Sequence, residues 1–145
     1  MKKIMIVDDD PSLTRTLELY FRGKDYHVFT LGTGREALEY WRGEEPDLVL
    51  LDVQLPDMDG PEVLERAKGE ELAGEVVMIT AFHDTEATLK AIRLGAADYL
   101  YKPIDLDALD LLLEKILRLK AERKELARLS HIISGSYKPN QIIGR

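Results

Sequence analysis

Polar side chains of the kinds that phosphate and magnesium chemistry uses follow four short apolar runs of this chain. They are three carboxylates, a hydroxyl and an amine: Asp8 and Asp9 after residues 4–7, Asp52 after 48–51, Thr80 after 76–79, and Lys102 after 99–101. In an open parallel α/β sheet the carboxyl ends of the strands share one edge, where residues far apart in sequence can converge on one crevice. The pattern therefore predicts a site for phosphate chemistry at that edge.

The three carboxylates predict a bound cation. Two like charges about 4 Å apart repel by roughly 4 kcal/mol at an effective dielectric near 20, and a third carboxylate adds to this. Mg²⁺ takes one or two carboxylates, keeps several waters and recruits a phosphate oxygen from substrate. The backbone carbonyl of Gln54, two residues after Asp52, is a further candidate ligand. We therefore expect Asp8, Asp9, Asp52 and the Gln54 carbonyl to hold Mg²⁺.

Lys102 and Thr80 are expected to contact the oxygens of a phosphoryl group. Lys102 precedes Pro103, and the extended geometry that proline imposes on its neighbour holds the ammonium at a strand end. It can pair there with a carboxylate and supply positive charge to an incoming phosphoryl group. Thr80 adds a hydroxyl donor. Positioning and charge neutralisation are most of what phosphoryl transfer requires of a protein.

The elements that position these residues alternate between strand and helix patterns, five times over, which is typical of an α/β fold with helices on both faces of a parallel sheet. The Val-, Ile- and Leu-rich third and fourth strands are expected at its centre. Four aspartates, Asp10, Asp57, Asp59 and Asp105, are interpreted as helix caps and turn residues. The 33–36 segment suits a capping box, and Gly23, Gly69 and Gly95 are expected near helix ends.

The last helix is expected to be unusually long, from about Asp105 to about Leu129, roughly twice the ordinary length. A possible coiled-coil seam follows steps of three and four residues, interrupted by Arg123 and Ser130: Leu112, Ile116, Leu119, Leu126 and Ile133. A solvated helical tail with scattered leucines is the alternative. We expect one domain over 1–120, an extended helix and coiled-coil linker over 105–133, and the start of a truncated following domain over 134–145.

Composition excludes several functions. Residues 1–113 hold 12 Lys and Arg against 24 Asp and Glu, or −12, whereas 114–128 hold 6 against 3, or +3. Because residues 1–113 are this acidic, they would repel the phosphate backbone of nucleic acid. Without cysteine there is no disulfide or thiolate site. Neither a signal peptide nor an apolar run near the roughly 20 residues of a membrane span is visible, so we expect a cytoplasmic location.

The motifs together resemble the receiver domain of two-component response regulators. Ile6-Val-Asp-Asp9 matches the acidic pair of that family, Leu50-Leu-Asp52 with Leu55-Pro-Asp-Met-Asp-Gly60 its phosphoacceptor loop, and Thr80-Ala81 and Lys102-Pro103 the remainder. The resemblance covers about residues 1–120. It implies a flavodoxin-like, doubly wound sheet of five parallel strands in the order 2-1-3-4-5, with an extended C-terminal helix.

The resemblance also implies roles for individual residues. Asp52 would accept a phosphoryl group from the phosphohistidine of a sensor histidine kinase, Asp8 and Asp9 would hold Mg²⁺, and Lys102 would contact the phosphoryl group. Thr80 with Tyr99 would form a conformational switch. Such a domain is a phosphoacceptor that assists its own Mg²⁺-dependent phosphorylation and dephosphorylation, and is not a turnover enzyme. Phe82 flanks the expected path of attacking water, and we hypothesise that it slows loss of the phosphoryl group.

The expected output is a homodimer formed through the surface of the fourth helix, fifth strand and fifth helix and through the coiled-coil linker. Residues 141–145 are similar to the opening of the ATPase domain of NtrC-type sigma-54-dependent activators, although the GxxxxGK[ST] loop of that ATPase is absent. A stand-alone receiver acting by protein binding remains an alternative. An aspartate-nucleophile phosphatase is disfavoured because Gln54 occupies the place of its second aspartate, and a flavodoxin-like electron carrier because three aspartates would repel its phosphate.

Overall fold

The computed structural model describes residues 1–81 and 85–136, with side chains as far as residue 130. Its sheet has five parallel strands in the order β2-β1-β3-β4-β5, which confirms the expected topology. The strands are β1 (Lys3–Val7), β2 (His27–Leu31), β3 (Leu48–Asp52), β4 (Glu75–Thr80) and β5 (Asp98–Tyr101). β1, β3, β4 and β5 each lie within one residue of the limits that the four apolar runs predicted.

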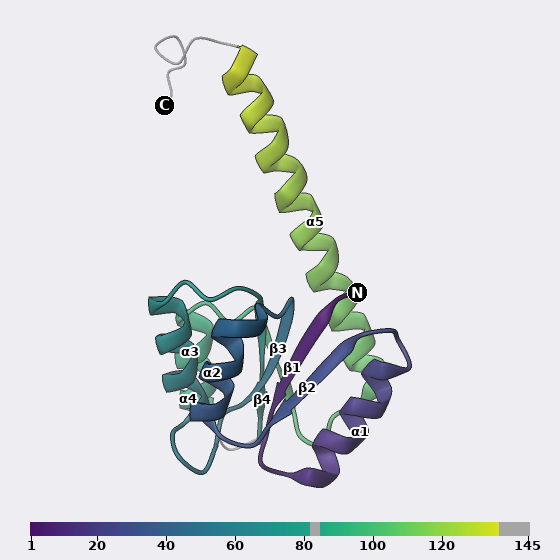
Figure 1. Cartoon of the computed structure of the whole chain (residues 1–145), viewed down its shortest axis with the longest axis vertical. Helices are drawn as coiled ribbons and strands as arrows, with labels where there is room; N and C mark the ends of the chain where they lie inside the picture. Colours follow the sequence, from purple (N-terminus) through teal and green to yellow (C-terminus); the bar gives the residue numbers. More distant parts are fainter. Residues whose placement is uncertain (82–84, 137–145) are drawn as a thin grey trace. The chain divides into compact units, whose positions relative to one another are not determined.

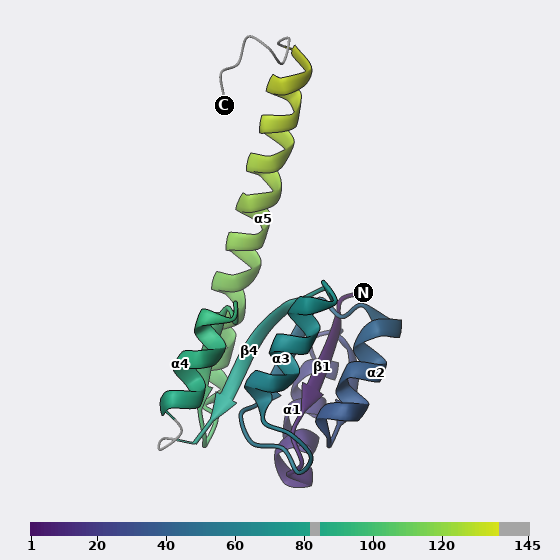
Figure 2. The same cartoon turned by 90° about the vertical axis from the view of Figure 1, so that its left-hand side faces the viewer.

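Four helices alternate with these strands: α1 (Pro11–Arg22), α2 (Gly34–Glu44), α3 (Gly60–Gly69) and α4 (Thr85–Arg93). Helix α1 lies on one face of the sheet, and α2, α3 and α4 lie side by side on the other (Figure 1). The second view shows the order of these three helices across the sheet (Figure 2). With both faces covered, the central strands consist mostly of apolar residues, and all five residues of β3, Asp52 included, are buried.

The helices begin where the sequence places a side-chain acceptor. Asp10 accepts from the backbone N–H of Ser12 at 3.0 Å, and Thr33 and Asp59 cap α2 and α3 in the same way. Each cap satisfies an N–H group that a helix start would otherwise leave without a partner. The left-handed turn expected after α4 is also present, because Gly95 has φ of 108°.

The core lies between the sheet and α2, α3 and α4. It joins inward-facing strand residues to the apolar faces of these helices; among its fully buried members are Met5, Val49, Leu51, Met78 and Leu64. Trp41 of α2 is buried there as well, and its indole N–H donates to the carbonyl of Ala73 at 2.6 Å. This packing gives the strand ends a rigid base.

Helix α5 (Leu106–Ser136) belongs to a second unit of the chain, 105–145. Asp105 caps it, accepting from the N–H of Asp107 at 2.9 Å. The helix continues past Leu129, where we expected it to end, and reaches Ser136, within the range 134–145 that we assigned to the start of a following domain. Residues 121–130 are all exposed. Of the predicted seam, Leu119 and Leu126 are 42% and 66% exposed, whereas Leu112 and Ile116 are buried, and the Ile133 side chain lies outside the described part. No helix in the described ranges is long and apolar enough to cross a membrane.

Candidate phosphoacceptor and metal site

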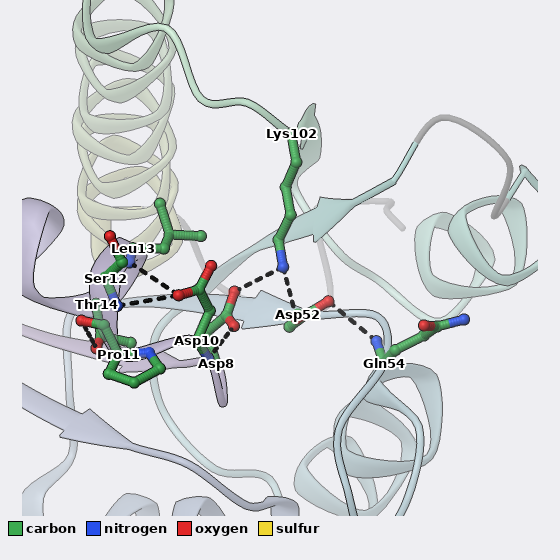
Figure 3. A network of polar contacts seen from close by, with 9 residues as sticks. All are labelled: Asp8, Asp10, Pro11, Ser12, Leu13, Thr14, Asp52, Gln54 and Lys102. Atoms are coloured by element: carbon green, nitrogen blue, oxygen red, sulfur yellow. Dashed lines mark hydrogen bonds and ion pairs between the residues drawn. The ribbon is translucent and has the colours of Figure 1, made fainter.

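Asp52 lies at the end of β3 beside Asp8, because the parallel pairing of Val7 with Leu51 puts the next residues of the two strands side by side. Both carboxylates are buried, and Asp8 and Asp52 are 2% and 5% exposed. Lys102 reaches them from the end of β5 (Figure 3). Its ammonium donates to Asp52 Oδ2 at 2.9 Å and lies 3.0 Å from Asp8 Oδ2. One cation therefore bridges the two predicted carboxylates.

The acidic cluster fits a divalent cation better than it fits Lys102 alone. Asp8, Asp9 and Asp52 each offer one carboxylate oxygen, and these oxygens lie within 4.8 Å of one another. Asp8 Oδ1 accepts from the N–H of Asp10 at 2.9 Å. Asp8 Oδ2 is buried and faces the Lys102 ammonium 3.0 Å away, with no other hydrogen-bond donor among the described residues. A buried carboxylate oxygen with unused lone pairs, next to exposed Asp9, has the character of a ligand for a hard metal ion such as Mg²⁺.

The electrostatics of the cluster follow from its burial. Burial raises the pKa of Asp52 to about 6, although Lys102 and the N–H of Gln54 act in the opposite direction, and the charge of Asp8 raises it further. Burial also lowers the pKa of Lys102, but its contacts with Asp52 and Asp8 outweigh that effect, so this pKa is raised overall. Above about pH 6 the Asp52 carboxylate is ionised, and the neighbouring charge of Asp8 repels it across the site.

The loop after β3 shapes the entrance to the site. The backbone N–H of Gln54 donates to Asp52 Oδ1 at 3.0 Å, which orients the carboxylate (Figure 3). Gly60 lies so close that a Cβ atom there would collide with the carbonyl oxygen of Asp52 and lie 2.9 Å from the Cα of Val53. A cavity of about 290 Å³ opens over the carboxylate, lined by Asp9, Asp52, Gln54, Leu55, Pro56, Ala81 and Lys102.

Thr80 lies at the end of β4, but its hydroxyl is not directed at this cavity. The side chain is fully buried. Its hydroxyl donates to the carbonyl of Ala81 at 3.0 Å and accepts from the hydroxyl of Thr88, on α4, at 3.1 Å. The structure thus places four of the predicted residues together, Asp8, Asp9, Asp52 and Lys102, with Gln54 beside them. The Thr80 side chain is held by its neighbours on the α4 side.

Tyr99 is on β5, paired with Met78 in the sheet register. Its ring is 38% exposed and packs edge-on against Tyr101, with the ring centroids 5.3 Å apart. Tyr99, which we expected to form a switch with Thr80, therefore lies at the surface. Phe82, for which we hypothesised a role in phosphoryl lifetime, lies outside the described residues.

Asp57, which we interpreted with three other aspartates as a cap or turn residue, is a cap, but sequence reasoning did not identify the helix that it caps. Its carboxylate accepts from the N–H groups of Gly34 at 2.8 Å and Arg35 at 2.9 Å. It therefore caps the start of α2 from the loop after β3. These backbone bonds lower its pKa, against the opposing effect of burial. Because the contact joins residues more than 20 positions apart, no local sequence signal could have revealed it.

Comparison with known proteins agrees with this geometry. The family of response regulator receiver domains matches residues 4–114. This chain belongs to that family. The receiver is 34% identical to the regulatory protein AtoC of Escherichia coli K12 over 143 residues, which are 99% of this chain and 31% of AtoC. It is 42% identical to the transcriptional regulatory protein ZraR of the same organism over 114 residues, or 79% of this chain and 26% of ZraR. The chain thus spans less than a third of the length of these relatives.

Solved structures show the same fold. The BeF3-activated N-terminal receiver domain of Klebsiella pneumoniae RstA has a TM-score of 0.73 and 32% identity, covering 81% of this chain and 99% of that one. A CheY-like receiver domain protein from Methanospirillum hungatei has a TM-score of 0.77 and 31% identity, covering 84% of this chain and 98% of that one. The receiver fold is therefore shared over most of the described residues.

Proposed function

We propose that this receiver is a phosphorylation-dependent switch in which Asp52 accepts a phosphoryl group from the phosphohistidine of a sensor histidine kinase. The observation that carries the proposal is the placement of Asp52, a buried carboxylate that opens into a cavity and is held by an ammonium on one oxygen and an N–H on the other. Family membership and the location that such a kinase implies also favour a cytoplasmic protein.

The chain's own residues account for the transfer. An oxygen of Asp52 attacks phosphorus, the P–N bond to the imidazole breaks, and the leaving nitrogen keeps the electron pair and is reprotonated from solvent. Gln54 N–H keeps the carboxylate oriented during attack, and Lys102 stays in contact with the oxygens that gain charge. Asp8, Asp9, Asp52 and the Gln54 carbonyl would hold Mg²⁺, which, when bound, neutralises charge on the phosphoryl oxygens.

The direct test is incubation of the 145-residue chain with Mg²⁺ and acetyl phosphate, followed by intact mass measurement. Wild type should gain one phosphoryl group, and Asp52→Asn should gain none. Asp59→Asn is a matched control from the same loop, because asparagine also caps a helix well, and it should be labelled like wild type. Equal uptake by wild type and Asp52→Asn would overturn the proposal.

We further infer that the output is a change in self-association that controls an attached domain. Two exposed apolar groups support this. On α4 and β5, Leu89, Ile92, Tyr99 and Tyr101 are each 37–48% exposed, and on α5, Leu119 and Leu126 lie on the predicted seam. A seam of this kind is stable when a second helix covers it. Thr80 and Tyr99 are the proposed link between Asp52 and the first of these surfaces.

Sedimentation with and without beryllofluoride tests the dimer. Leu126→Ser should weaken association, whereas Leu111→Ser, equally exposed at 69% on the same helix but off the seam, should not. Equal weakening by both substitutions would contradict the seam, and a monomer under every condition would contradict the dimer.

The nature of the attached domain rests on the sequence and on the relatives. Residues 141–145, outside the described part, are similar to the opening of an NtrC-type ATPase domain, and ZraR is named a transcriptional regulatory protein. We propose that this receiver regulates a sigma-54-dependent activator of that type. The alternative is a stand-alone receiver that acts by binding another protein.

A further inference from the structure

The hydroxyl pair formed by Thr80 and Thr88 is a buried polar contact that the phosphoacceptor chemistry does not use. Thr80 ends β4 and Thr88 lies on α4, and the two residues are 0% and 4% exposed. Their hydroxyl oxygens are 3.1 Å apart. A buried hydroxyl–hydroxyl bond between a strand end and a helix fixes the side-chain rotamers on both sides.

The direction of this bond follows from the proton count. Thr80 has one hydroxyl proton, and its oxygen is 3.0 Å from the carbonyl oxygen of Ala81, which can only accept. Thr80 therefore donates to Ala81, and the proton between the two threonines must come from Thr88. The Thr80 hydroxyl thus has its donor and one acceptor position engaged away from Asp52. When the Thr80 side chain turns toward a group bound on Asp52, so that the hydroxyl oxygen moves away from α4, both contacts are lost.

We propose that Thr88 is a positioning residue. It holds the Thr80 hydroxyl in the orientation directed away from Asp52, and it thereby lowers the affinity of the site for a phosphoryl group. The inference rests on the proposed function, since it requires Thr80 to turn toward a group on Asp52. A hydrogen bond present in only one of two states biases their ratio by about three- to tenfold. The same helical turns carry exposed Leu89 and Ile92, so the bond also ties the site to that surface.

Removing the Thr88 hydroxyl while keeping its shape isolates this effect. Thr88→Val is nearly isosteric, and Thr88→Ser keeps the donor. Beryllofluoride with Mg²⁺ is the probe, and its dissociation constant is measured by titration calorimetry on the 145-residue chain. We expect Thr88→Val to bind beryllofluoride about three- to tenfold more tightly than wild type, and Thr88→Ser to bind it as wild type does.

A double-mutant cycle supplies a readout that a general packing effect would not give. In a Thr80→Val background, Thr88→Val should no longer change the affinity. Urea unfolding of the four proteins without ligand should show coupling between the two positions, since each single substitution breaks the same bond. Affinity unchanged by Thr88→Val, or tightened equally in the Thr80→Val background, would overturn the inference.

The outcome for wild type separates the two proposals. If wild type binds beryllofluoride and Thr88→Val binds it no more tightly, only the role of Thr88 is lost. If wild type fails to bind beryllofluoride and fails to take phosphate from acetyl phosphate, the proposed function is lost, and the role of Thr88 with it.

Discussion

Ionised Asp52 should destabilise the protein when no metal is bound, and Asp52→Asn should relieve this. Its pKa is about 6 in the folded protein against an ordinary value of 3.8. Each unit corresponds to about 1.4 kcal/mol, so the full effect is about 3 kcal/mol. The folded state binds the proton more tightly than the unfolded state does. The contribution of Asp52 to the free energy of unfolding should therefore be highest below about pH 4, fall as the pH rises to about 6, and stay low above it.

The assay is urea unfolding followed by circular dichroism in EDTA, at several pH values between 4 and 8. Other groups titrate in this range as well, so the useful quantity is the difference between Asp52→Asn and wild type. That difference should grow between pH 4 and pH 7.5, to about 1–2 kcal/mol in favour of the variant at pH 7.5. It should not reach the full value, because the buried amide also needs hydrogen-bond partners.

Two comparisons serve as controls for this prediction. Asp59→Asn, a change of the same kind at an exposed helix cap, should not reproduce the gain in stability that Asp52→Asn gives at pH 7.5. Adding Mg²⁺ should stabilise wild type more than Asp52→Asn, since a ligand stabilises the state that binds it. If Asp52→Asn were less stable than wild type at pH 7.5 in EDTA, the repulsion inferred from burial would be refuted.

Two further substitutions test the loop that holds the site. Gly60→Ala should lower the free energy of unfolding by about 1–3 kcal/mol and slow phosphate uptake, because the new methyl group would collide with the Asp52 carbonyl. Urea unfolding measures the first effect and the mass assay the second. Normal stability with normal uptake would contradict the close approach. Asp57→Ala should cost about 1 kcal/mol by uncapping α2 at Gly34, whereas Glu65→Ala, on the exposed face of α3, should leave the unfolding free energy nearly unchanged; equal effects would contradict the cap.

Much of the fold could be predicted from the sequence because the signals were local. A helix cap such as Asp10 or Thr33 acts on N–H groups two or three residues away, and a buried parallel strand such as β3 is an apolar run. The meeting of Asp8 with Asp52 was also predictable, since parallel strands bring their carboxyl ends to one edge. These predictions needed a topology but no side-chain detail.

The remaining features depend on tertiary contacts. The turn of the Thr80 hydroxyl toward Thr88 is decided by where α4 packs, and the cap from Asp57 to α2 by how two loops meet. The Lys102–Pro103 peptide bond is cis, whereas the sequence indicated only an extended residue before proline. We predicted the end of α5 at about Leu129, too early by several residues. Its last turns hold no local stop signal before Gly135, and that glycine lies inside the helix, which extends to Ser136.

The charge balance of the site connects its chemistry to the switch. Three carboxylates and one ammonium leave a formal charge of −2 at neutral pH, and a divalent cation brings it to zero. A phosphoryl group on Asp52 replaces one negative charge by about two, so it makes the site negative again and adds oxygens that need donors. Lys102 is already in contact with the cluster. Thr80 lies one residue beyond Ile79, the strand position paired with Asp52. Its hydroxyl is a nearby donor that now contacts Ala81 and Thr88, and turning it toward Asp52 would break its bond to α4. In the proposed switch, charge added at Asp52 would thereby change how α4 is held.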